Sequence, residues 1–152
     1  MCEHKRAYFA HSRYQYGLPE EKQAIKWIQM KFPYYKIYNP GSAKHQKELL
    51  KETNPFMPVL EYMGVFFRII DTCNILVYTT ITGTNKVGRG TFEEIKYAFI
   101  TRKIPVYYIT SNGKIQAANF ADLTECHMKS GKKDWSKNWA KVNLLGGDNK
   151  RI

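Results

Sequence analysis

Residues 74–109 constrain the fold of this chain more than any other segment. Two apolar runs, at 74–78 and 104–109, flank a stretch that contains Gly88 and Gly90 and continues as a helix-forming sequence. This order predicts a strand, a glycine-containing loop, a helix and a second strand, which is the way parallel sheets are assembled. The loop would then lie at the carboxyl end of the strands, where such sheets bind their ligands.

The loop itself has the features of an anion-binding segment. Glycines at 88 and 90 allow the backbone to approach a ligand closely, and the N–H groups that open the following helix favour a negative charge. We therefore predict that Gly88, Arg89, Gly90 and Thr91 contact the substrate.

Two carboxylates follow this loop. Glu93 and Glu94 are expected in the first turn of the helix, at the mouth of the same crevice. A carboxylate beside a loop that tolerates phosphate suggests chemistry on a sugar or a nucleotide. The alternative is that these glutamates only complement the helix dipole, and short glycine motifs also arise by chance.

The rest of the chain alternates between strand and helix patterns. We expect further strands at 7–10 and 35–38, and helices from Pro19 to before Pro33, at 43–52, at 58–72 and at 120–129. Proline and acidic residues at 19–21 are typical of a helix start. The alternation predicts an α/β fold, with an open, mostly parallel sheet and helices on both faces.

Length and charge indicate the organisation and the kind of partner. A chain of 152 residues fits one domain, and we place it at 1–130 with a basic C-terminal segment at 131–152. The net charge is +11, and residues 129–152 hold seven Lys and Arg against two Asp. Such a charge favours nucleotides, nucleic acid or an acidic protein, unless it is only a solvated surface. Nucleic acid is disfavoured, because no known DNA- or RNA-binding motif accompanies the charge.

Other sequence signals argue against metals and membranes. The three cysteines are widely spaced, which gives neither a disulfide framework nor a zinc pattern, so we predict no metal and no cofactor. We find no apolar run of membrane-spanning length and no signal peptide. The expected location is the cytoplasm.

Two loops of the predicted sheet together resemble a known group of enzymes. An aromatic strand with Tyr8 leads into a Ser-containing loop with Ser12, and a Gly-x-Gly loop precedes Glu94, with Tyr97 and Ala98 three and four positions later. These features, within residues 6–110, resemble the nucleoside 2-deoxyribosyltransferase-like superfamily, which includes the 2'-deoxynucleoside 5'-phosphate N-hydrolases. The second loop is also similar to that of the lysine-decarboxylase-like nucleotide-binding proteins.

The resemblance implies a flavodoxin-like (Rossmann-like) sheet, a homodimer or larger assembly, and cleavage of the N-glycosidic bond between a (deoxy)ribose and a base. Glu94 would be the carboxylate that attacks or stabilises the anomeric carbon. The chain departs from the family in two places. The position of a second carboxylate holds Phe66, with Glu61 and Asp71 as the nearest acids, and the acidic residue before the Gly-x-Gly loop is Lys86.

Five further residues complete the candidate site. With Glu94, the catalytic candidates are Tyr8, which would contact the sugar or base, and His11, which would donate a proton near neutral pH. Ser12 and Arg13 are expected to bind a phosphate, and Asn39 the base or ribose. Each also has an ordinary structural explanation: a core tyrosine, a polar surface loop, or an Asn-Pro-Gly turn.

We therefore predict a protein that binds a nucleoside or nucleotide, favoured in phosphorylated form by the positive charge, and cleaves or transfers its N-glycosidic bond. Two alternatives remain. One is a non-catalytic nucleotide-binding or sensing domain on the same fold. The other is a basic accessory protein associated with nucleic acid, whose affinity would depend steeply on salt.

Overall fold

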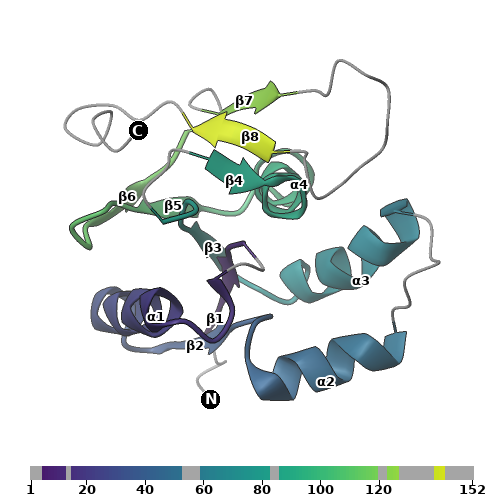
Figure 1. Ribbon diagram of the computed structural model, residues 1–152, viewed down its shortest axis with the longest axis horizontal. Helices are drawn as coiled ribbons and strands as arrows, with labels where there is room; N and C mark the ends of the chain where they lie inside the picture. Colours follow the sequence, from purple (N-terminus) through teal and green to yellow (C-terminus); the bar gives the residue numbers. More distant parts are fainter. Residues whose placement is uncertain are drawn as a thin grey trace.

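The computed structural model describes residues 5–12, 15–52, 59–82, 86–119, 123–126 and 139–142 (Figure 1). Its strands are β1 (Lys5–Ala10), β2 (Tyr35–Tyr38), β3 (Ile75–Tyr78), β4 (Lys86–Gly88), β5 (Val106–Ile109), β6 (Ile115–Ala117), β7 (Leu123–Cys126) and β8 (Trp139–Val142). Its helices are α1 (Pro19–Lys31), α2 (Ala43–Glu52), α3 (Val59–Ile70) and α4 (Arg89–Lys96), and α4 continues as a π-helical segment at Tyr97–Arg102. The helices predicted at 19–32, 43–52 and 58–72 are confirmed over the described residues.

The larger sheet has the strand order β2-β1-β3-β5-β6. β1 pairs in parallel with both β2 and β3, β3 pairs in parallel with β5, and only β6 runs antiparallel to its neighbour. The predicted α/β fold with a mostly parallel sheet is therefore confirmed. From β1 the chain moves first to β2 on one side and then back across to β3 on the other, so the strand order reverses between β1 and β3.

Side chains of β1 alternate between the two faces of this sheet. Ala7 and Phe9 pack in one apolar cluster with Ala24 and Ile28 of α1. Tyr8 and Ala10 belong to a different cluster, whose helical members are Ile70, Phe92, Ile95 and Ala98. Figure 1 shows the same arrangement, with α1 on one side of the strands and α3 and α4 on the other. Helices therefore cover both faces, as predicted.

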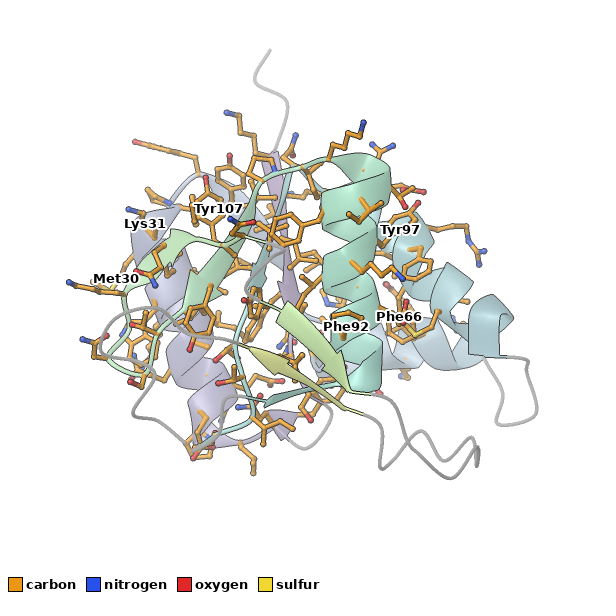
Figure 2. The ribbon with its side chains drawn as sticks, turned by 90° about the horizontal axis from the view of Figure 1, so that it is seen from above. Met30, Lys31, Phe66, Phe92, Tyr97 and Tyr107 are labelled. Atoms are coloured by element: carbon orange, nitrogen blue, oxygen red, sulfur yellow. The ribbon has the colours of Figure 1, made fainter. Side chains whose placement is uncertain are left out.

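α1 is amphipathic. Its first turn holds Pro19, Glu20 and Glu21, and its buried face is apolar apart from Glu21. Met30 is 80% exposed, and Figure 2 shows Met30 and Lys31 on the outer side of the helix, pointing away from the strands. This helix covers the sheet face that carries Phe9.

The smaller sheet has the order β4-β8-β7 and is antiparallel throughout. The helix predicted at 120–129 is wrong, because residues 123–126 form β7. The sequence Leu-Thr-Glu-Cys alternates with a period of two, which suits a strand once β8 provides a partner. β8 lies inside the basic C-terminal segment, so this sheet joins residues from both sides of position 130.

No helix in the described part of the chain has the length and apolar character needed to cross a membrane.

Candidate functional site

Tyr8 and Glu94 meet inside the protein, although they are far apart in sequence. Tyr8 lies on β1 and Glu94 on α4, and the Tyr8 hydroxyl donates a hydrogen bond to Glu94 Oε2. Tyr8 is fully buried and Glu94 is 6% exposed. The structure thus brings together two of the three residues predicted to be catalytic.

The position of Glu94 within its helix differs from the prediction. Gly88 ends β4 in an extended conformation and caps α4, which begins at Arg89, so no acidic residue lies in the first turn. The expected glycine loop is therefore wrong over 88–91: Gly88 belongs to a strand, and Arg89, Gly90 and Thr91 belong to the first helical turn. The pairing of β4 with β8 draws these residues into regular structure.

Glu94 is placed one turn deeper than expected, and this determines its electrostatics. Burial raises the pKa of Glu94 to about 8, although the hydrogen bond from Tyr8 acts in the opposite direction. The pKa of Tyr8 is raised well above its usual value, first by burial and then by the charge of Glu94. A group with a pKa near the working pH can both hold and release a proton. A helix-dipole role alone does not explain a buried carboxyl group with this partner.

Glu93 occupies the neighbouring position on α4 and is half-buried, whereas Glu94 is buried. The two neighbouring glutamates therefore differ in burial.

His11, the third catalytic candidate, lies on the opposite face of the sheet. Its ring stacks on Phe9 with a centroid distance of 3.9 Å. His11 Nε2 lies 2.6 Å from Glu21 Oε2, and Nδ1 lies 3.1 Å from the carbonyl oxygen of Phe9. Both ring nitrogens of His11 are thus engaged by oxygen atoms on this face of the sheet. His11 is a buried partner of Glu21 and does not join Tyr8 and Glu94.

Glu21 is a residue that the sequence analysis missed. Burial alone would raise the pKa of Glu21. Hydrogen bonds from His11 and from the Gly17 N–H, together with the charge of His11, outweigh this effect, so the pKa is lowered overall. Its only sequence signal is its place in the first turn of α1, which many surface glutamates share.

Asn39 also joins this second group. Its Oδ1 accepts a hydrogen bond from the Gly41 N–H at 2.9 Å, and its side chain also forms a hydrogen bond with the Glu21 carboxylate. The structure therefore places Asn39 beside Glu21 and within a turn. Its predicted contact with a base or ribose stays a prediction.

Ser12 and Thr91, two of the residues predicted to bind the phosphorylated substrate, lie just after strands. Ser12 follows β1 and is buried, and Thr91 is buried in the first turn of α4. Arg13 lies outside the described residues.

Asp71, one of the two acids considered for a second carboxylate, is paired away from Glu94. Asp71 follows α3 at the amino end of β3, where it accepts a hydrogen bond from the Tyr97 hydroxyl at 2.6 Å and lies 3.4 Å from Arg102 Nε. Phe66 is buried, as expected for a core residue. The side chain of Glu61 lies outside what the structure describes.

A crevice of about 500 Å³ opens over the carboxyl ends of β1, β3 and β5. Its lining includes Phe9, His11, Gln15, Trp27, Thr80 and Thr110. Because Phe9 and α1 line it, the crevice opens on the face of the sheet opposite to Tyr8 and Glu94.

Comparison of the chain with protein-family models, with curated proteins and with solved structures found no match. The functional argument therefore depends on the residues and their geometry.

Proposed function

We propose that this protein binds a nucleoside or nucleotide and cleaves or transfers its N-glycosidic bond, with Glu94 as the reacting carboxylate. The observation that carries the proposal is the buried hydrogen bond from the Tyr8 hydroxyl to Glu94. The sequence resemblance assigns a catalytic role to the same glutamate, and the pairing with Tyr8 comes from the fold.

We further propose that the sheet is flavodoxin-like. The order β2-β1-β3-β5 is that of a doubly wound sheet in which ligands bind at the carboxyl ends near the first and third strands. β6 departs from this pattern, because it runs antiparallel to β5.

The proposed reaction proceeds in two displacements. Ionised Glu94 attacks the anomeric carbon, the bond to the base nitrogen breaks, and the base departs with the electron pair and takes a proton from solvent. Water or a second base then attacks the same carbon and releases the carboxylate. Tyr8 positions Glu94 by donating a hydrogen bond to it. With a pKa of about 8, roughly a tenth of Glu94 is ionised at pH 7 in the unliganded protein.

The direct test is incubation of the full chain with a panel of nucleosides and nucleoside monophosphates, with chromatography to detect free base. Release of a base from at least one compound supports the proposal. If no compound in the panel releases base, the proposed activity is rejected.

A nucleoside monophosphate is expected to bind more tightly than the matching nucleoside. The proposed reason is contact of the phosphate with Ser12, Arg13 and the first turn of α4. One charge-assisted contact contributes roughly 1.5–3 kcal/mol, which is about tenfold or more in affinity. Calorimetry that gives equal affinities would remove the phosphate from the proposed substrate.

A symmetric dimer or larger assembly is also proposed, and it depends on the resemblance. α3 is rich in apolar residues and would offer the surface for such an interface. In the structure, Val65 and Phe66 of α3 pack with Leu49 of α2, so much of that surface is covered within the chain. Light scattering at tens of micromolar should nevertheless show a dimer with an isologous interface, and a monomer alone would contradict the proposal.

The second candidate is a nucleotide-binding or sensing domain without catalysis. It is favoured by the burial of Glu94, which keeps the carboxyl group largely neutral at pH 7. Saturable nucleotide binding without any release of base would support this candidate over the enzyme.

A further inference from the structure

We propose that the crevice on the α1 face of the sheet is a second small-molecule site, distinct from the Tyr8–Glu94 pair, that takes an uncharged ring bearing a carboxamide or lactam group. Two buried polar atoms without partners among the described residues define its chemistry. They are Gln15 Oε1 and Thr80 Oγ1.

The orientation of Gln15 follows from its own hydrogen bonds. Its Nε2 donates to the Thr80 carbonyl oxygen at 3.2 Å and to Thr82 Oγ1 at 3.1 Å. The Thr80 carbonyl can only accept, so the amide nitrogen must face it and Oε1 must face the other way. Gln15 is 5% exposed, and its free oxygen is an acceptor that needs a donor from a ligand.

Thr80 supplies the complementary group. Its side chain is fully buried and lines the same crevice, and its hydroxyl can donate as well as accept. An acceptor from Gln15 and a donor from Thr80 together match an amide or a lactam, which carries an N–H beside a carbonyl oxygen. Buried polar groups of this kind are costly unless they are paired, so a bound ligand would satisfy both.

Apolar residues of the lining suit the body of a planar ring. They are Phe9, Ala24 and Trp27. Trp27 is backed by the turn at Gly113, which has a φ of +88° and whose Cα approaches so closely that a Cβ there would lie 2.5 Å from the indole. A volume of about 500 Å³ is in the range of small-molecule sites.

The charges of the crevice argue against an anion. Its described lining includes Glu20 and Glu21 but no Lys or Arg. His11 is bonded to Glu21 and to the Phe9 carbonyl oxygen, so its two ring nitrogens are already engaged. A phosphate or carboxylate would meet these two carboxylates, and the described lining offers no Lys or Arg to offset them. This distinguishes the crevice from the phosphate contacts proposed near the start of α4.

Benzamide and benzoate test the proposal as a matched pair, because they share a ring and differ in the charge and the N–H groups. Ligand-observed NMR titration of the full chain should give saturable benzamide binding, with benzoate at least about tenfold weaker because like charges repel. Uracil, as a lactam, should compete with benzamide, and inorganic phosphate should not. Equal binding of benzoate, or no binding of benzamide and uracil, would overturn the proposal.

Thr80→Val supplies the residue-level test. Valine keeps the shape and removes the hydroxyl, so benzamide affinity should fall about five- to tenfold, the scale of one hydrogen bond. The urea midpoint should not fall, because the hydroxyl has no partner among the described residues. A lower midpoint, or unchanged affinity, would show that the hydroxyl serves the fold and would reject its role in binding.

Two controls separate this site from the proposed enzyme. Thr101→Val makes the same change at an exposed position on the π-helical segment and should leave benzamide binding unchanged. Glu94→Gln should also retain benzamide binding, because Glu94 packs against the other face of the sheet. Loss of benzamide binding in either variant would contradict a separate site, whereas absence of base release by the wild type would reject only the proposed enzyme.

Discussion

Glu94→Gln is expected to lower turnover by at least about a hundredfold, the scale seen when one preorganised electrostatic contact is lost. Glutamine has nearly the same size and can still accept the hydrogen bond from Tyr8, but it cannot form the carboxylate needed at the anomeric carbon. Substrate affinity should change little, because the loss falls on the transition state. Chromatographic measurement of base release gives kcat and KM for both proteins.

Glu93→Gln is the matched control. It makes the same chemical change at the neighbouring position of α4, where the side chain is half-buried. Its turnover should stay close to that of the wild type. If the two variants have equal effects, or if Glu93→Gln has the larger effect, then Glu94 is not the reacting carboxylate.

The second large effect concerns stability and pH. Burial raises the pKa of Glu94 from its usual 4.5 to about 8 in the folded protein. Between these values the folded state holds a proton that the unfolded state has released, so the free energy of unfolding falls as pH rises. The stabilisation from protonated Glu94 is complete below the pKa of the unfolded state. It decreases by about 1.4 kcal/mol per pH unit as the pH rises toward the pKa of the folded state.

Urea denaturation of the wild type and of Glu94→Gln at a series of pH values tests this effect. Between about pH 5 and pH 7.5 the wild type should lose about 3 kcal/mol relative to the variant. The pKa of Glu21 is lowered, so its contribution is lost only toward acid pH and lies outside this window. Parallel stability curves for the two proteins would show that Glu94 is not held neutral by the fold.

The four parallel strands of the larger sheet could be predicted from sequence because their signals are local, whereas β6 was not predicted. Apolar runs define β1, β3 and β5, and the acidic start and apolar stripe define α1. β4, β7 and β8 carry no such signal, because none of them is a continuous apolar run and each is stabilised by pairing within the smaller sheet. The helix predicted at 120–129 shows this limit, since its few residues also fit a strand once a partner is present.

The candidate site was predicted in part for the same reason. The resemblance identified Glu94, and the fold supplies Tyr8 as its partner. His11 was grouped with them by proximity in sequence, yet residues 7, 9 and 11 share one face of β1 and residue 8 faces the other way. The alternation of side chains along a strand already separates odd-numbered His11 from even-numbered Tyr8 at the level of sequence. The pairing of His11 with Glu21 depends on how α1 packs, which no local pattern records.

The central place of β8 in the smaller sheet sets an order of events during synthesis. The strands of the larger sheet all precede residue 118, so a growing chain contains every strand of that sheet before it contains β8. β4 has no partner until β8 emerges, because Gly88 pairs with Trp139 and β7 pairs only with β8. Until then β4 is an open strand edge, which other chains can join. α4 contacts both β4 and β8, so Glu94 reaches its final surroundings only after residue 142 has been translated.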